Sequence, residues 1–227
     1  GFWLKKTLYI YRMIYDIQTA AKTAEQLLQI NAIKLSPKNP FTWASGWQSP
    51  IYCDNRITLS YPEIRSYLAQ SIAAQVKGLY GTDVVIAGVA TGAIGIGMLV
   101  AAEMNLPFIY IRPESKKHGR QNQIEGALPS QAKVVVIEDL ISTGKSSLNA
   151  VRALRETDAE VLGMIALFTY DFATAAENFK TAKVTLHTLS DYPTLIEVAK
   201  DQKAIDPSEL ALLKKWRENP SEWSPTS

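Results

Sequence analysis

One stretch of the chain, residues 134–147, constrains the fold more than any other. It reads Val-Val-Val-Ile-Glu-Asp-Leu-Ile-Ser-Thr-Gly-Lys-Ser-Ser, so four β-branched apolar residues lead directly into two carboxylates. An apolar run of this kind is typical of a parallel strand that is covered on both faces. Ligands of open α/β sheets bind outside the carboxyl ends of the strands, and Glu138 and Asp139 fall at that end.

The residue types that follow the strand suit a sugar phosphate. Paired carboxylates accept hydrogen bonds from the vicinal hydroxyl groups of a ribose. Residues 142–147 offer hydroxyl groups, backbone N–H groups and one ammonium. The helix that we expect to begin near Ser146 adds its positive end, which favours a phosphate monoester in this loop.

Gly144, Lys145 and Ser146 also allow another interpretation, the P-loop of a nucleotide hydrolase. That motif requires a glycine five residues before Gly144, where this chain has Asp139. The negative charge of Asp139 would face the phosphates, so the P-loop is disfavoured. An ordinary strand followed by a capped helix is the plainer alternative. The adjacent carboxylates weaken it, because they repel each other unless something binds them.

Residues 134–147 closely resemble the phosphoribosyl pyrophosphate (PRPP) signature of the type I phosphoribosyltransferases. The resemblance implies that the two acids hold the ribose hydroxyls and that the following loop holds the 5′-phosphate. On this basis the expected PRPP-binding residues of the stretch are Glu138, Asp139, Leu140, Ile141, Ser142, Thr143, Gly144, Lys145 and Ser146.

A cationic segment lies upstream, where five basic residues fall within positions 112–120. Its polar composition predicts a mobile loop, although a solvated run of charges would have the same composition. The pattern Arg-x-Glu-x-Lys-x-His-Gly resembles the catalytic loop of the orotate phosphoribosyltransferases. This resemblance implies that Arg112, Lys116 and His118 bind PRPP and stabilise the departing pyrophosphate. Some members carry a lysine directly after the arginine, where this chain has Pro113.

A third segment, residues 40–56, contains the pattern Ser-Gly-x-x-Ser-Pro-x-Tyr. Turns rich in Ser, Gly and Pro that frame aromatic residues suit a flat heterocycle, although a surface hairpin would also explain them. The pattern is similar to the orotate-binding hood of the same family. It implies that Ser45, Gly46 and Tyr52 contact orotate, together with Ser142. Several relatives carry a lysine where this chain has Ala44.

A glycine-rich segment, residues 88–97, follows another apolar run. Its glycines allow a close approach of the backbone to an anion, and they equally fit a helix packed tightly on a sheet. It resembles the pyrophosphate-binding loop of the family. The resemblance implies a non-proline cis peptide bond around Ala90 and Thr91.

Alternating strands and helices predict an α/β fold, a parallel sheet flanked by helices, and the resemblance implies the type I phosphoribosyltransferase fold with a small N-terminal hood. We expect residues 1–12 to lie outside the core and residues 13–227 to form one domain, with the hood over about 13–60 and the core over about 61–200. The expected helices span 17–30, 61–79 (capped by Ser60), 93–104, 146–157 and 173–179, with two more at the C-terminus. The expected strands are the hood strands within 40–58, then 83–88, 107–112, a return strand ending at 127, 133–138, 160–168 and 183–188.

Bulk properties exclude several classes of protein. The 227 residues carry a formal charge of only +2, so no strong field for nucleic acid or membranes is expected. Cys53 is the only cysteine, which excludes an intrachain disulfide and fits a reducing, cytoplasmic compartment. No spacing of residues suggests a metal site, so we expect Mg²⁺ to arrive with PRPP. No uncharged run is long enough to span a bilayer.

The resemblance implies a homodimeric enzyme with shared active sites. It would transfer ribose 5-phosphate from PRPP to N1 of orotate, giving orotidine 5′-monophosphate and pyrophosphate in pyrimidine biosynthesis. Two alternatives are a purine-specific phosphoribosyltransferase and an inactive PRPP-sensing regulator. The first should lack the cationic loop and the hood pattern, and the second should have lost Lys116 and His118. Residues 201–227 show no chemistry in the sequence.

Overall fold

A six-stranded sheet forms the centre of the computed structural model, which describes residues 13–114 and 123–224. The strand order is β10-β9-β8-β5-β6-β7. Within the described residues, neighbouring strands run parallel except β7, which pairs antiparallel with β6. The strands are β5 (Val85–Val89), β6 (Phe108–Ile111), β7 (Ile124–Glu125), β8 (Lys133–Ile141), β9 (Glu160–Thr169) and β10 (Leu186–Asp191). The predicted parallel sheet is confirmed.

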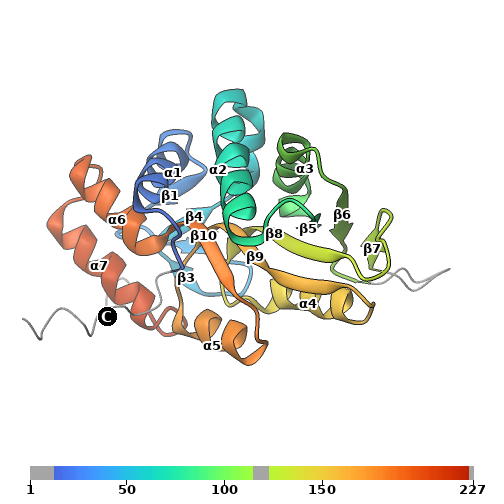
Figure 1. Cartoon of the computed structure of the whole chain (residues 1–227). Helices are drawn as coiled ribbons and strands as arrows, with labels where there is room; N and C mark the ends of the chain where they lie inside the picture. The colour runs from blue at the N-terminus through green and yellow to red at the C-terminus, as the bar shows by residue number, and fades with distance from the viewer. Residues whose placement is uncertain (1–12, 115–122, 225–227) are drawn as a thin grey trace, which may run out of the picture.

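Helices cover both faces of this sheet (Figure 1). One face carries α1 (Ile17–Gln29), α2 (Pro62–Tyr80) and α3 (Gly92–Met104), and the other carries α4 (Lys145–Arg155) and α5 (Ala173–Thr181). Two further helices, α6 (Tyr192–Asp201) and α7 (Pro207–Glu218), lie beyond the β10 edge, where α6 packs on α1. Val134 to Ile137 are fully buried between the two helical layers, as their apolar run predicts.

The N-terminal hood consists of two short antiparallel ribbons. The first pairs β1 (Ile33–Leu35) with β4 (Ile51–Cys53), and the second pairs β2 (Phe41–Thr42) with β3 (Gln48–Ser49). A 3₁₀ helix, η1 (Asn55–Ser60), then leads into α2. The hood strands expected within residues 40–58 are present, and β1 begins earlier than the sequence indicates.

Three local predictions need correction. Ser60 does not cap α2, because it ends η1 and the N-cap position belongs to Tyr61. Strand β8 continues to Ile141, three residues past the predicted end, because it keeps pairing with β9. Strand β10 begins at Leu186 rather than at residue 183, because Lys183 has a left-handed φ of 53° where the chain leaves α5.

The strand order creates a switch point between β5 and β8. After β5 the chain goes to β6 on one side, and it returns to β8 on the other side of β5. The pairing of β5 with β8 ends at Gly88 and Ile137, beyond which the two strands are no longer paired. Ligands of open α/β sheets bind at such a point, outside the carboxyl ends of the strands.

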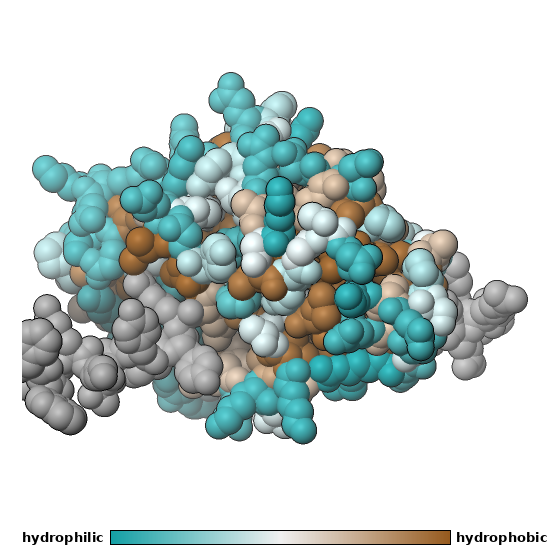
Figure 2. All heavy atoms as spheres, viewed as in Figure 1, coloured by the Kyte–Doolittle hydropathy of each residue, from teal (hydrophilic) through white to brown (hydrophobic). Residues whose placement is uncertain are grey.

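On the face seen in Figure 2, hydrophilic residues cover most of the outer parts, and hydrophobic residues show mainly toward the middle. In residues 13–114 and 123–224, no helix has both the length and the apolar composition that crossing a bilayer requires.

Candidate active site

The acid pair predicted from the sequence lies at the switch point. Glu138 and Asp139 are consecutive residues of β8, directly after its last pairing with β5. Glu138 is buried, with 5% of its surface exposed. One of its carboxylate oxygens accepts a hydrogen bond from the Ser147 hydroxyl (2.7 Å) and the other from the Asp139 N–H (2.9 Å). These bonds fix the Glu138 side chain before any ligand arrives.

Burial raises the pKa of the Glu138 carboxyl well above its ordinary value, and the neighbouring Asp139 carboxylate raises it further. Glu138 therefore retains a proton more readily than an exposed glutamate does. A ligand hydroxyl that donates to this pair would favour the charged form, because it supplies the hydrogen bond that water gives an exposed carboxylate.

Asp139 lies against the first turn of α3. A Cβ atom at Gly92 would collide with its carboxylate, so a larger residue at that position would displace the Asp139 side chain. The peptide bond between Ala90 and Thr91 is cis, as the resemblance implied. The Ala90 N–H donates to Ile111 O (2.8 Å), which ties the loop after β5 to the end of β6. The positive end of α3 thus faces the same crevice as the acids.

The loop after β8 has a fixed backbone. Gly144 is buried, has a left-handed φ of 78° and is the N-cap residue of α4. The Asn178 amide donates to Thr143 O (2.8 Å), and a Cβ atom at Gly144 would lie 2.6 Å from the Phe179 ring. Among the described side chains none caps α4, so its first-turn N–H groups stay available to an anion.

The remaining residues of the predicted PRPP set take different positions. Lys145 and Ser146 are exposed at the start of α4. Ile141 is buried, and its backbone oxygen accepts a hydrogen bond from the Tyr170 N–H (3.1 Å). This bond ties the end of β8 to the residue that follows β9. The next residue after the predicted set, Ser147, uses its hydroxyl to hold Glu138.

A pocket of about 290 Å³ lies between the hood and the carboxyl ends of β8 and β9. Ser142 and Tyr52, both predicted from the sequence, meet there. Ser45 and Gly46 lie at the tip of the β2–β3 hairpin, where the Gly46 N–H donates to Trp43 O (2.8 Å). The lining residues are Thr42, Trp43, Ala44, Tyr52, Cys53, Leu140, Ser142 and Tyr170. We call this cavity the base pocket, because its flat aromatic walls suit a planar ring.

Sequence reasoning did not identify Trp43 or Cys53 as pocket residues. Burial raises the pKa of the Cys53 thiol well above its ordinary value, and nearby carboxylates raise it further. Burial also raises the pKa of the Tyr170 hydroxyl well above its ordinary value. Both groups therefore keep their protons near neutral pH and act as neutral walls. Asn55, also unpredicted, joins the hood to β8 through a hydrogen bond from its side-chain amide to Asp139 O (2.7 Å).

Arg112 directly follows β6, at the edge of the sheet where the loop after β5 is anchored. Its N–H donates to Gln123 O (2.8 Å), and its guanidinium lies 3.7 Å from the Glu125 carboxylate. These contacts close the base of the cationic segment. Lys116 and His118 lie outside the described residues.

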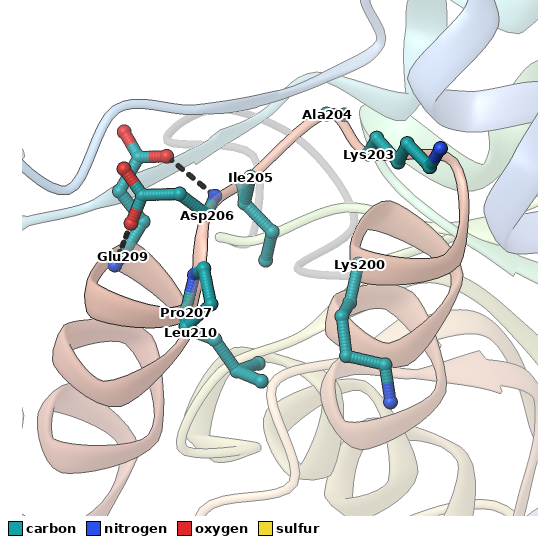
Figure 3. Close-up of a pocket in the computed structure, with 8 residues that line it drawn as sticks. All are labelled: Lys200, Lys203, Ala204, Ile205, Asp206, Pro207, Glu209 and Leu210. Carbon is teal, nitrogen blue, oxygen red and sulfur yellow. Dashed lines mark hydrogen bonds between the residues drawn. The ribbon is translucent and has the colours of Figure 1, made fainter.

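A larger hollow of about 570 Å³ lies between α6 and α7 (Figure 3). Asp206 and Glu209 cap α7 reciprocally there, and both carboxylates also lie near the Lys38 ammonium, at 2.9 and 3.6 Å. The acids are therefore engaged in holding the start of α7. No residue of β8, of the loop after it or of the hood lines this hollow, so it is separate from the acid pair.

Comparison with known proteins assigns the family. Residues 56–196 match the family described as phosphoribosyl transferase domain. An orotate phosphoribosyltransferase of Phocaeicola vulgatus is 54% identical over 200 residues, which cover 88% of this chain and 94% of that protein. One of Cytophaga hutchinsonii is 51% identical over 202 residues, which cover 89% of this chain and 97% of that protein.

Solved structures with a similar fold agree. The UMP synthase of Leishmania donovani superposes with a TM-score of 0.73 at 27% identity, over 87% of this chain and 42% of that one. This chain therefore spans less than half of that synthase. The orotate phosphoribosyltransferase of Aeropyrum pernix gives a TM-score of 0.68 at 28% identity, over 81% of this chain and 99% of that one.

Proposed function

We propose a reaction and its residues from the premise that this chain belongs to the phosphoribosyltransferase family and, within it, to the orotate phosphoribosyltransferases. The reaction is the transfer of ribose 5-phosphate from PRPP to N1 of orotate. Orotidine 5′-monophosphate and pyrophosphate are its products, which makes this a step of pyrimidine biosynthesis.

One observation carries this proposal, the contact between the base pocket and the polar end of β8. Ser142 lines the base pocket and also begins the loop that leads into α4. Leu140 lines the same pocket and directly follows Asp139. A planar base in the pocket would thus lie beside a sugar held by the acids, with the phosphate of that sugar in the loop.

The acids Glu138 and Asp139 would accept hydrogen bonds from the 2- and 3-hydroxyl groups of the ribose. Their negative charge favours the oxocarbenium-like state through which the reacting carbon passes. The buried Ser147 hydroxyl and the first turn of α3 keep the two carboxylates in position. The ring is then oriented without side-chain rearrangement during the reaction.

The 5′-phosphate would bind to Ser142, Thr143, Gly144, Lys145 and Ser146. Uncapped N–H groups at the start of α4 and the positive helix end favour a dianion there. Asn178 donates a hydrogen bond to the loop backbone at Thr143, and the Phe179 ring packs against Gly144. The phosphate thus anchors the substrate at the end away from the bond that breaks.

The pyrophosphate would leave toward the loop after β5 and Arg112. Lys116 and His118, from the segment after Arg112, would add charge and a proton donor over the leaving group. The described residues contain no cluster of three or more metal-ligating side chains. A Mg²⁺ ion would enter with PRPP and take its ligands mainly from pyrophosphate oxygens and water. Bound there, it would neutralise charge on the leaving group.

Orotate would lie between Tyr52 and Ser142, with the hairpin tip at Ser45 and Gly46 over the entrance. We also propose a homodimer in which the cationic segment of one subunit serves the site of its partner. A cytoplasmic location fits a chain whose single cysteine, Cys53, is free.

The test is to incubate the purified protein with PRPP and Mg²⁺ and to add orotate, hypoxanthine or uracil separately. Consumption of orotate alone, with release of pyrophosphate, is the expected result. Turnover of hypoxanthine instead would identify a purine enzyme. PRPP binding without turnover of any base would identify a regulator.

A further inference from the structure

The C-terminal helix α7 packs behind the base pocket, although the sequence of residues 201–227 suggests no chemistry. We propose that Trp216 of α7 positions the two aromatic rings that line this pocket, Trp43 and Tyr170, and thereby determines the affinity for orotate. This inference rests on the proposed function, because it concerns how the base subsite of that reaction is built.

Three rings from distant parts of the chain contact one another. Trp216 is fully buried, and its ring centroid lies 5.6 Å from that of Trp43 and 5.8 Å from that of Tyr170. Both contacts are edge-to-face, with interplanar angles of 84° and 88°. Trp43 and Tyr170 also contact each other at 5.1 Å. Trp43 comes from the hood and Tyr170 follows β9, so Trp216 is a common support for walls from two different elements.

The position of Trp216 is set by packing. Within the described part of the chain, no group accepts a hydrogen bond from its indole N–H. Phe172 and Tyr192 contact the same ring, each with a centroid distance of 5.3 Å. Edge-to-face geometry is specific in angle, so an aliphatic side chain at position 216 could not reproduce these contacts.

The residue after Trp216 fixes α7 to the same segment. The Arg217 guanidinium donates to Asp171 O (3.0 Å) and to the Asp171 carboxylate (2.9 Å). Asp171 directly follows Tyr170 and has a left-handed φ of 56°. Helix α7 therefore contacts two consecutive residues after β9. Trp216 packs on the Tyr170 ring, and Arg217 binds Asp171.

Loss of the Trp216 ring should affect the binding of orotate and not that of PRPP. Without the Trp216 ring, Trp43 and Tyr170 lose their shared support, and the wall that these two rings form together is no longer held in place against a planar ligand. The aromatic rings that contact Trp216 belong to neither β8 nor α4, which carry the proposed ribose and phosphate contacts. Binding of orotate should weaken, and binding of PRPP should not.

The test compares Trp216→Leu and Trp216→Phe with the matched control Leu213→Ala. Leu213 is equally buried on α7, and its backbone oxygen still accepts the Tyr192 hydroxyl bond after substitution. Trp216→Leu and Leu213→Ala each replace a large buried side chain with a smaller one, so each opens a cavity and lowers the Tm. Trp216→Leu should raise the KM for orotate about tenfold and leave the KM for PRPP within about twofold. Trp216→Phe should shift the orotate KM in the same direction by less, and it carries the test if Trp216→Leu does not fold.

Leu213→Ala should lower the Tm and leave both KM values near those of the unsubstituted protein. The inference is overturned if the Trp216 variants keep the orotate KM, or if Leu213→Ala raises it equally at the same loss of Tm. An unsubstituted protein that forms no orotidine 5′-monophosphate would instead overturn the proposed function.

Discussion

The side-chain amide of Asn55 joins the hood to the acidic end of β8, because its Nδ2 donates a 2.7 Å hydrogen bond to the backbone oxygen of Asp139. Its Oδ1 accepts a bond from the Cys53 thiol (3.2 Å), and Cys53 lines the base pocket. One buried side chain thus connects the pocket proposed for the base with the acids proposed for the ribose. Glycosyl transfer requires the base nitrogen and the ribose carbon to be aligned within a fraction of an ångström.

Replacing this amide should slow the reaction more than it weakens binding. Asn55→Ala removes the bridge and leaves the Asp139 oxygen without its donor, which costs about 1–3 kcal/mol for a buried group. We expect kcat to fall by about tenfold or more, with smaller changes in both KM values. Thr58→Val is the control, because it removes a buried bond to Asn55 O (2.6 Å) in the same turn and leaves the bridge intact. Steady-state kinetics that give Asn55→Ala an unchanged kcat would contradict the positioning role.

The raised pKa of Glu138 predicts a stability effect that depends on pH. A carboxyl group with a raised pKa in the folded state stabilises the fold when neutral, below its unfolded pKa, and loses this contribution as pH rises through the folded pKa. Glu138→Gln removes the ionisation. The stability of the variant relative to the unsubstituted protein should therefore increase as the pH is raised from 5 to 8, and its activity should fall. Denaturant unfolding of both proteins at the two pH values measures this, and an equal difference at both would oppose it.

Lys116→Ala tests the leaving-group role of the cationic segment. Removing one electrostatic contact to the departing pyrophosphate should lower kcat with orotate by at least about 10²-fold. Lys117→Ala is the matched control, since it removes the same charge from the next position of the same segment. If both variants lower kcat with orotate by the same factor, the loss of one positive charge explains the effect, and Lys116 has no special role in catalysis.

Gly144→Ala tests the proposed phosphate loop. A side chain at this position has to adopt a left-handed φ of 78° and would lie 2.6 Å from the Phe179 ring, so the loop has to shift. We expect the KM for PRPP to rise about tenfold or more. Gly81→Ala is the control: its φ is 80°, but open space surrounds the added carbon and it ends α2, away from the site. It should cost about 1 kcal/mol of stability and leave the KM unchanged.

The sequence predicted the elements whose information is local. The run Val134–Ile137 indicated a buried parallel strand, and the acids and glycine after it indicated a site at its end. This prediction was possible because the strand, the loop and the start of α4 follow one another within 14 consecutive residues. The cis peptide bond at Ala90 and Thr91 was predicted from resemblance rather than from physics.

The sequence did not predict how distant segments assemble. Trp43, Tyr170 and Trp216 each fit an ordinary apolar core, and nothing local shows that their rings meet. Ser60 had the residue type of a helix cap, but η1 extends through it and leaves Tyr61 at the cap position. Tertiary pairing with β9 carried β8 past its predicted end. In each case a contact across the fold overrode a local preference.

A crystal structure of the protein with PRPP and Mg²⁺ tests the central claim most directly, that the end of β8 holds the ribose and the loop after it holds the phosphate. The prediction is that both ribose hydroxyl groups lie within about 3 Å of carboxylate oxygens of Glu138 and Asp139, and that the 5′-phosphate contacts backbone N–H groups within residues 143–147. PRPP bound with its ribose away from both acids, or with its phosphate outside this loop, would contradict it.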